Sequence, residues 1–393
     1  MARFLFVVPP LSGHVNPTVS VGRELARRGH DVAWAGLPGA VDPLLPPDAL
    51  FLPAGSPEAI EHVDDLRLRS RGLRAAAAFK FLWENVLLPL GYAMVDGVDR
   101  VVEQWQPDVL VADQQTLAGG AVARRRGLRW ATSATTTAEL VDVLAGLPLA
   151  EQWVDEQVVR FQADIGMPPD LVSTHGLRVS EHLVLVFSTR RLVGEHHDFP
   201  DHFAFVGPSI SDRPEPDDFP WDWLDPEQPH VLVSLGTVNT QAGERFFGVA
   251  AEALAGEALQ AVFVAPPSLV GEAPNILVRE RVPQLGLLPH LDAVVCHAGH
   301  NTVCETLAHG LPLVLAPIRD DQPVVADQVV QAGAGVRVRF GRVLPADLRK
   351  AVHTVLDEPT FRTAAGDIRL SFEAAGGALA AAIRLESLCV PAP

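Results

Sequence analysis

The sequence predicts an α/β protein of two doubly wound, Rossmann-like domains that face each other across a cleft. Short apolar, β-branched runs alternate with longer amphipathic runs, which is typical of parallel strands joined by crossover helices. The chain has 393 residues, more than one hydrophobic core usually fills. An unpatterned, proline-rich segment separates two series of such runs. We therefore expect an N-terminal domain over 1–206, a linker over 207–229 and a C-terminal domain over 230–393, with the last helix able to pack back on the first domain.

The first half begins with a strand at 3–10 and a helix at 16–29. Pro17 fits the first turn of that helix and Gly29 lies past its end. A second strand follows at 31–36. The same alternation predicts further strands at 107–113, 128–134 and 182–188, and a helix at 117–127.

The second half repeats the architecture without a detectable sequence repeat. Strands are expected at 230–237, 259–265, 275–278, 291–297, 311–317 and 334–338, and an alanine-rich helical segment follows Asp357. Ligands of open α/β sheets bind outside the carboxyl ends of the strands. Three loops that follow strands are therefore candidate sites: "PPLSGH", "SLGT" and "CHAGHNT".

Composition narrows the partners. The chain carries 31 Lys+Arg against 48 Asp+Glu, a net charge of -17 that repels nucleic acid and anionic lipid. Three cysteines are too few for a disulfide framework and favour a reducing compartment, so we expect a cytoplasmic protein. The N-terminal "MARFLFVVPP" indicates a strand and no signal peptide. The apolar run from Phe81 carries Glu84 and Pro89, so it predicts no membrane span.

The stretch "VVCHAGHNTVCETLAHGLP", residues 294–312, predicts an anion site at a helix start. Gly299 would allow a tight turn, and the unpaired N–H groups of the first helical turn would face the ligand. An imidazole with amide and hydroxyl donors suits a diphosphate. Glu305 would stay on the ligand side and could accept ribose hydroxyls. The opposite face would be buried through Val303, Cys304, Leu307 and Leu311.

The run 281–322 resembles the donor-binding signature of the inverting family-one glycosyltransferases, and "PPLSGHVNP" resembles their acceptor-domain loop. High Ala and Arg with low Lys usage is most similar to the bacterial members that decorate antibiotics such as macrolides and enediynes, including the calicheamicin type. The resemblance implies transfer of a sugar from a nucleoside diphosphate donor, a dTDP-deoxysugar, to a hydroxyl of an apolar aglycone. It implies no cofactor and no metal ion.

The resemblance also implies roles for single residues. The diphosphate would be held by His297, Asn301 and Thr302, the ribose by Glu305, and sugar hydroxyls by Asp321 and Gln322. Gly236 and Thr237 would lie near the phosphates. Many relatives have an aromatic residue where Arg281 stands, so Val282 would supply backbone contacts to the base. A second glycine or a tryptophan is commoner in the family than His300. The donor set therefore comprises Gly236, Thr237, Arg281, Val282, His297, Gly299, His300, Asn301, Thr302, Glu305, Asp321 and Gln322.

The acceptor hydroxyl must lose its proton as it attacks, and a histidine with a pKa near ~6.5 suits that task. His14 follows the first strand, and in the family such a histidine is held by an acid, here Asp113. The acid would fix the tautomer and stabilise the imidazolium. The apolar helix that contains Phe81, Trp83 and Leu87 would line the acceptor pocket.

Each assignment has an alternative. His14 could be a turn histidine, Asp113 a helix N-cap, and Glu305 a solvated carboxylate. The side chains of Cys296, His297, His300 and Cys304 offer the ligand atoms of a zinc site, but the sequence contains none of the C-x-x-C pairs that are typical of such sites. A dehydrogenase would need a G-x-G-x-x-G after the first strand. Two other functions fit the sequence: a nucleotide-sugar epimerase of this fold and a catalytically silent partner of a glycosyltransferase. The sequence also does not distinguish a dTDP donor from a UDP donor, or a monomer from a homodimer.

Overall fold

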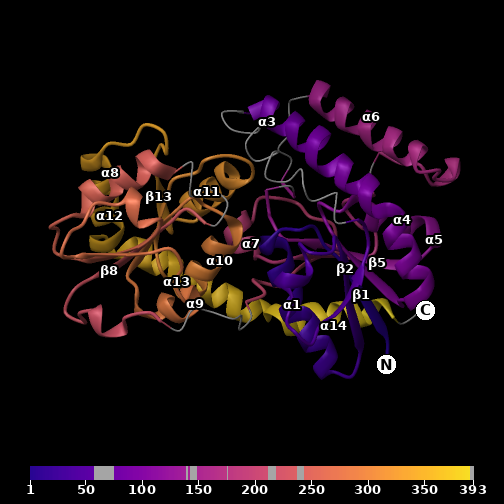
Figure 1. Ribbon diagram of the computed structural model, residues 1–393, viewed down its shortest axis with the longest axis horizontal. Coiled ribbons are helices and arrows are strands. Elements are labelled where there is room, and N and C mark those ends of the chain that lie inside the picture. The colour runs from indigo at the N-terminus through magenta and orange to yellow at the C-terminus, as the bar shows by residue number, and fades with distance from the viewer. Residues whose placement is uncertain are drawn as a thin grey trace. The chain divides into compact units, whose positions relative to one another are not determined.

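The computed structural model describes residues 1–56, 75–138, 140–141, 148–174, 176–210, 218–236 and 243–389. The chain divides into two compact units. The first unit comprises Met1–Phe187, Asp198–Ser211 and Ala375–Pro393, and the second comprises Ser188–His197 and Asp212–Ala374. The short segment Ser188–His197 thus groups with the second unit, although the sequence predicts it in the first domain. Figure 1 shows the chain from indigo at its start to yellow at its end.

The first unit contains a parallel sheet in the order β3-β2-β1-β4-β5-β6-β7 among the described residues. Its strands are β1 (Arg3–Val7), β2 (Asp31–Gly36), β3 (Leu50–Pro53), β4 (Val109–Asp113), β5 (Arg129–Ala134), β6 (Val184–Val186) and β7 (Phe203–Phe205). Its helices are α1 (Ser12–Arg27), α3 (Ala75–Leu82), the π-helix η3 (Trp83–Leu87), α4 (Leu88–Trp105), α5 (Leu117–Arg126), α6 (Pro148–Asp164) and α14 (Gly377–Leu388). Short 3-10 turns lie at Asp42–Leu44 and Pro169–Leu171.

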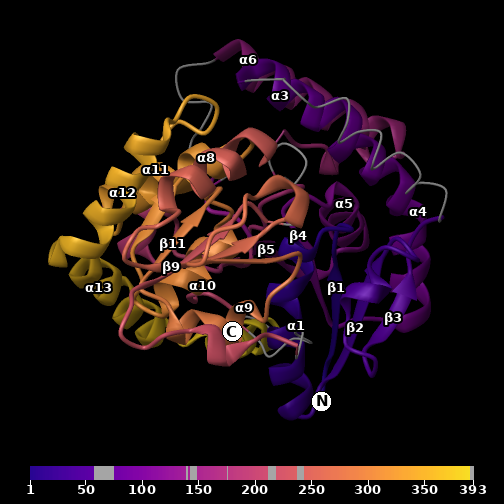
Figure 2. The same cartoon turned by 60° about the vertical axis from the view of Figure 1, so that its left-hand side comes forward.

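Both faces of this sheet are buried, because alternate residues of a strand point to opposite sides. Phe4 and Phe6 of β1 pack with α1 and α14, whereas Leu5 and Val7 pack with α4 and α5. Figure 2 shows β2 and β3 beside β1, and α3 and α6 next to each other. The central strands therefore consist almost entirely of apolar residues, as strands covered on both faces should.

The last helix, α14, belongs to the first unit. Ala381, Ala382 and Leu385 are fully buried in the same cluster as Leu25 of α1. The Gly377 N–H donates to the Val206 carbonyl at 2.7 Å, which ties the start of α14 to the end of the sheet. Figure 1 shows this yellow helix running along α1.

The second unit contains a parallel sheet in the order β10-β9-β8-β11-β12-β13. Its strands are β8 (His230–Ser234), β9 (Gln260–Val264), β10 (Ile276–Arg279), β11 (Ala293–Cys296), β12 (Leu313–Leu315) and β13 (Gly335–Arg337). Its helices are α7 (Arg190–Val193), α8 (Glu244–Leu254), α9 (Gln284–Leu287), α10 (His300–Ala308), α11 (Gln322–Gln331), α12 (Pro345–Asp357) and α13 (Pro359–Ala375). Three 3-10 turns lie at Trp221–Trp223, Pro267–Leu269 and Leu288–His290.

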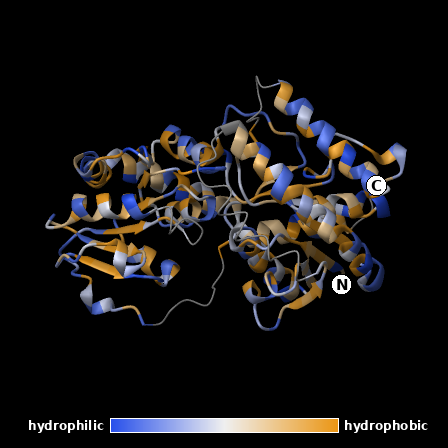
Figure 3. Ribbon diagram, turned by 45° about the horizontal axis from the view of Figure 1, so that its top comes forward, coloured by the Kyte–Doolittle hydropathy of each residue, from blue (hydrophilic) through white to orange (hydrophobic). Residues whose placement is uncertain are grey.

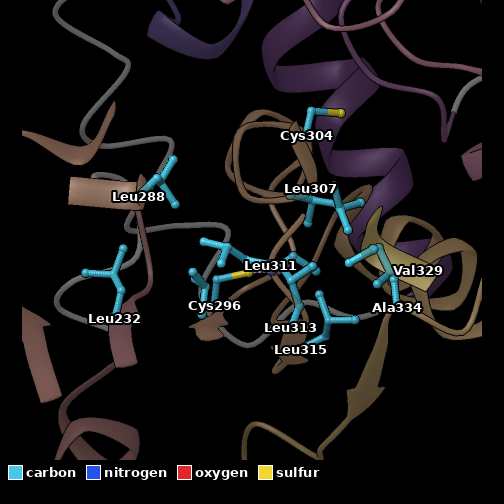
Figure 4. Packing of buried hydrophobic residues seen from close by; sticks show 14 of the residues in the cluster. Leu232, Leu288, Cys296, Cys304, Leu307, Leu311, Leu313, Leu315, Val329 and Ala334 are labelled. Atoms are coloured by element: carbon cyan, nitrogen blue, oxygen red, sulfur yellow. Dashed lines mark hydrogen bonds between the residues drawn. The ribbon is translucent and has the colours of Figure 1, made fainter. Parts of the chain in front are cut away.

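Helices cover both faces of this sheet as well. Val231 and Val233 of β8 face α8 and α12, whereas Leu232 packs with residues of α10, α11 and α13. Figure 4 shows Leu307, Leu311, Leu313 and Leu315 gathered beside Cys296 in the second of these clusters. Figure 3 shows the strands coloured mainly as hydrophobic and the helices with mixed faces, as this layering requires.

The α/β class and the two doubly wound sheets predicted from the sequence are confirmed. Three details differ. The first helix starts at Ser12, so Pro17 lies inside it, past the first turn. The 207–229 segment is not exposed throughout, since Phe219 is buried in a core cluster of the second unit. Strands β3 and β7 were not expected, because their short runs are only partly buried. Among the described residues, no helix is long and apolar enough to cross a membrane.

Candidate active site

His14 and Asp113 lie together in the first unit. His14 stands in the first turn of α1, directly after β1, and Asp113 is the last residue of β4, the neighbour of β1 in the sheet. The His14 Nδ1 is 3.0 Å from each oxygen of the Asp113 carboxylate. The Asp113 side chain is fully buried, while 14% of the His14 side chain is exposed. The buried acid thus contacts one ring nitrogen of a histidine that solvent can reach.

Two further donors fix the Asp113 carboxylate. The Gln115 N–H donates to Oδ1 at 2.8 Å, and the Thr135 hydroxyl donates to Oδ2 at 3.0 Å. Helix α5 starts later, at Leu117, with Thr116 in the N-cap position. Asp113 is therefore not the N-cap of α5, and its carboxylate is turned towards His14.

A half-buried cation, Arg178, lies near this pair, and the sequence analysis missed it. The Arg178 Nε donates to the Gln114 carbonyl at 3.1 Å, and its guanidinium carbon lies 5.3 Å from the centre of the Trp83 ring. Burial lowers the pKa of Arg178 to about 10, opposed by the negative charge of Asp113. Arg178 stays protonated near neutral pH and balances the charge of the buried carboxylate. No spacing in the sequence links it to residue 113.

The acceptor-lining residues are not placed as expected. Trp83 and Leu87 are each 1% exposed and pack in a core cluster with Leu117 and Phe161. Their helix buries the same apolar face that suggested a pocket wall, because core and ligand-lining positions share one helical period. Phe81 is half-buried, and its contact with an acceptor stays a prediction.

The second unit carries the predicted turn between β11 and α10. The tight turn is made by Ala298, whose φ is 66°, and Gly299 is the N-cap of α10 with an ordinary φ of -64°. The expectation that Gly299 supplies the turn is therefore wrong. The absence of a side chain at Gly299 has another reason: a Cβ there would lie 2.4 Å from the Nε2 of His297.

The His297 ring lies close to two glycines. A Cβ on Gly236, which follows β8 and has a φ of +71°, would come within 2.8 Å of the Cε1 of that ring. His297 is 9% exposed, and its Nδ1 has no hydrogen-bond partner among the residues that the structure describes. Burial lowers the pKa of His297 to about 4, against the opposing charge of Asp321 and a hydrogen bond with the Ser234 backbone. The ring is thus neutral near pH 7, and a polar atom is left for a ligand.

Helix α10 buries Val303, Cys304 and Leu307, as predicted, and Leu311 is buried past its end. Glu305 does not face solvent on the ligand side: it is 6% exposed and accepts a 2.6 Å hydrogen bond from the Gln284 Nε2. This side chain closes onto α9 because its carboxylate, once buried, needs a donor. Its contact with a ribose stays a prediction.

The remaining donor residues are spread over this unit. His300 is 5% exposed and its Nε2 lies 3.5 Å from the Cys304 Sγ, so its ring turns into the helix packing. Asn301 and Thr302 are half-buried in the first turn of α10, Arg281 is exposed, and Val282 packs partly against the core. Thr237 lies outside the described residues. Asp321 is the N-cap of α11.

Gln322 caps the loop before α11 with its own side chain. Its Oε1 accepts from the N–H groups of Ile318 and Arg319 at 2.9 and 3.2 Å.

Cys296, Cys304 and Cys389 are free thiols, and burial raises the pKa of Cys296 to about 12. Within the described residues, no group of three His, Cys, Asp or Glu could hold a metal ion.

Comparison with known proteins identifies this architecture. The model of the UDP-glucoronosyl and UDP-glucosyl transferase family matches residues 196–371. A 4'-demethylrebeccamycin synthase from Lentzea aerocolonigenes is 30% identical, over 98% of this chain and 99% of that protein. The glycotransferase of kitacinnamycin superposes with a TM-score of 0.79 at 25% identity over 99% of both chains. The glycosyltransferase VinC, solved in complex with dTDP, superposes at 0.75 with 20% identity over 98% of this chain and 99% of that one.

The two doubly wound sheets define a glycosyltransferase of the GT-B fold. The chain belongs to the family of UDP-glucoronosyl and UDP-glucosyl transferases. Its relatives include the glycotransferase of kitacinnamycin, and the calicheamicin glycosyltransferase CalG4 has the same fold, with a TM-score of 0.76 at 22% identity over 100% of both chains.

Proposed function

We propose that this protein is an inverting, metal-independent glycosyltransferase that moves a deoxysugar from a dTDP donor to a hydroxyl group on an apolar natural-product aglycone. The observation that carries the proposal is the contact between His14 and the buried Asp113, at 3.0 Å to both carboxylate oxygens. The Asp113 carboxylate accepts a hydrogen bond from the Nδ1–H group of His14, which leaves Nε2 as the basic nitrogen. His14 is then the general base.

The reaction balances with one base. The acceptor hydroxyl gives its proton to the His14 Nε2 as its oxygen forms a bond to the anomeric carbon. The bond from that carbon to the diphosphate oxygen breaks on the opposite face, and the electron pair leaves with the diphosphate. Attack opposite the leaving group inverts the anomeric configuration.

The second unit supports the choice of donor. The N-terminus of α10 provides the positive end of a helix dipole, which stabilises a diphosphate. His297 adds a neutral imidazole whose Nδ1 has no partner among the described residues. A thymidine donor is favoured by the likeness to VinC, which was solved with dTDP. The free thiols favour a reducing compartment, and we place the enzyme in the cytoplasm.

Donor choice is tested by thermal shift with dTDP, UDP and NAD, each with and without Mg²⁺. We expect dTDP to raise the melting temperature without metal and more than UDP does, and His297→Ala to reduce that shift. Protection that needs Mg²⁺, or that appears only with NAD, would contradict the assignment.

The base is tested with His14→Ala on an alcohol acceptor. We expect turnover to fall by ~10²- to 10⁴-fold, the usual share of a general base, with the dTDP shift unchanged. A phenol acceptor that is ionised at the assay pH should recover part of the rate. NMR of the product should show the inverted anomer. Near wild-type turnover of the variant rejects His14 as base, and epimerised donor without a glycosylated product would favour the epimerase alternative.

A further inference from the structure

We propose that Thr135 is a positioning residue that holds His14 in the tautomer with the proton on Nδ1. The inference rests on the proposed function of His14. Thr135 directly follows β5, and it is 3% exposed. Its Oγ1 lies 2.7 Å from the His14 Nδ1 and 3.0 Å from the Asp113 Oδ2.

The sheet order explains how these three residues meet. Strands β1, β4 and β5 are neighbours, and the three residues stand at or just past their carboxyl ends. Asp113 pairs with Ser133 in the register of β4 and β5, which places Thr135 just beyond the carboxylate. The arrangement is therefore built by the backbone of one sheet.

Counting protons assigns the tautomer. A threonine hydroxyl has one proton, and an ionised carboxylate only accepts. The Thr135 proton therefore goes to Oδ2, and its oxygen can only accept from the nitrogen 2.7 Å away. Nδ1 then faces an acceptor in its contacts with both Asp113 oxygens and with the Thr135 hydroxyl oxygen. A bare Nδ1 would point its lone pair at these oxygens, so the proton stays on Nδ1 and Nε2 remains unprotonated.

Thr135 also limits the motion of the carboxylate. Oδ1 accepts from the Gln115 N–H and Oδ2 from the Thr135 hydroxyl, so each oxygen has its own donor and the carboxylate plane is fixed. Without the hydroxyl, Asp113 keeps one anchor and the imidazole loses its shortest contact. The ring can then turn, and the population with a protonated Nε2, which cannot act as a base, rises.

The test compares Thr135→Val, which keeps the shape and removes the hydroxyl, with Thr135→Ser, which keeps the hydroxyl. Thr132→Val is the matched control: Thr132 lies in β5 and is fully buried, and its hydroxyl group donates to the Arg178 carbonyl and accepts from the Ser180 N–H. We measure turnover on an alcohol acceptor, and the ¹⁵N shifts of the His14 ring in protein without substrate at a pH where the ring is neutral. Near-ultraviolet circular dichroism checks that each variant is folded, and Thr135→Ala replaces the valine variant if it is not.

We expect Thr135→Val to lower turnover roughly tenfold, a part of the ~10²- to 10⁴-fold share of the base itself. The two ring ¹⁵N shifts should move towards each other as the second tautomer appears. Thr135→Ser should restore both readouts, and Thr132→Val should leave the ring shifts unchanged.

The proposal is overturned if Thr135→Val keeps the wild-type ring shifts, or if Thr135→Ser is as impaired as the valine variant. His14→Ala, measured in parallel, separates the two proposals. If His14→Ala retains turnover, the base assignment fails, whereas the ring shifts still report whether Thr135 holds the tautomer.

Discussion

Two glycines from different loops, Gly236 and Gly299, lie close to the ring of His297, and the burial of this ring decides the charge of the residue. Because burial lowers its pKa from 6.5 to about 4, the folded protein binds fewer protons than the unfolded chain between these values. The stability that comes from a neutral His297 is complete above about pH 6.5. It is lost as the pH falls towards 4.

Replacing His297 should therefore flatten part of the acid sensitivity of the second unit. We expect the wild type to lose roughly 2 kcal/mol of unfolding free energy from this residue between pH 7 and pH 5, at about 1.4 kcal/mol for each pH unit. His297→Asn should lack that loss, measured by urea unfolding at both pH values. His290→Asn, at an exposed histidine, is the control and should keep the wild-type slope. Equal slopes in the wild type and His297→Asn would contradict the neutral ring.

At this scale the sequence located His14, Asp113 and His297 but not their partners. Thr135 and Arg178 contact the same site from residues far along the chain, and a hydroxyl after a strand carries no spacing that points to residue 14. Only the sheet order β1-β4-β5 brings them together. The hydrogen bond between Gln284 and Glu305 was not predicted, because it depends on how α9 packs beside α10.

Among the elements, α14 is held to α1 by an ion pair as well as by its apolar face. The Arg28 guanidinium donates two bonds to the Glu386 carboxylate at 2.8 and 2.7 Å, and the His30 Nε2 lies 2.8 Å from the same carboxylate. The hydrogen bond from Arg28 is the main cause that lowers the pKa of Glu386 to about 2. This pair stabilises the fold above about pH 4.5 and ceases to do so as the pH falls through about 2.

Glu386→Gln should lower the unfolding free energy of the first unit by ~1 kcal/mol at pH 7, a modest value because the pair is partly solvated. The difference from the wild type should shrink as the pH is lowered below about 4.5, where the free carboxylate protonates. Glu373→Gln, which breaks an exposed pair with Arg369 on α13, should have little effect. If Glu386→Gln and Glu373→Gln change the unfolding free energy equally, the ion pair between Arg28 and Glu386 stabilises the first unit no more than an exposed pair does.

Strand predictions were accurate where a run is buried on both faces. The strand predicted at 31–36 is β2 without change, and β4, β5 and β11 lie inside their predicted ranges. The apolar character of the helix with Trp83 was predicted, but the packing of its apolar face in the core was not. Helical periodicity identifies the buried face and does not show whether protein or ligand covers it. Gly299 was assigned to a turn that Ala298 makes, since a glycine between polar residues usually indicates the turn itself.

For the whole molecule, the first unit is discontinuous, because its core includes residues from the last helix. Removing 376–393 should uncover the face of α1 that Ala381, Ala382 and Leu385 cover. We expect calorimetry of the truncated chain to show the melting transition of the second unit and to lose that of the first. Leu385→Ala should weaken the first unit by ~2–4 kcal/mol, and Leu379→Ala, at a residue 46% exposed, should not. Two intact transitions after truncation would mean that α14 is dispensable.

The division into two doubly wound sheets could be predicted from the rhythm of apolar runs. The excursion of 188–197 into the second unit could not, because α7 contacts α11 and its four residues carry no pattern of their own. The sequence permitted the packing of the last helix on the first domain but did not require it, since an alanine-rich helix can cover any surface of small residues.

The place of α14 has a consequence for how the protein is made. A ribosome releases the chain from its N-terminus, and domains tend to fold as they emerge. Here residues 375–393, which complete the core of the first unit, are synthesised after residues 212–374. The second unit can therefore fold before α14 packs against α1. During that interval the nascent chain exposes apolar residues of α1, among them Val19 and Leu25, that belong to the same core cluster as the last helix. Release of the last helix then ends the exposure and completes the half that carries His14.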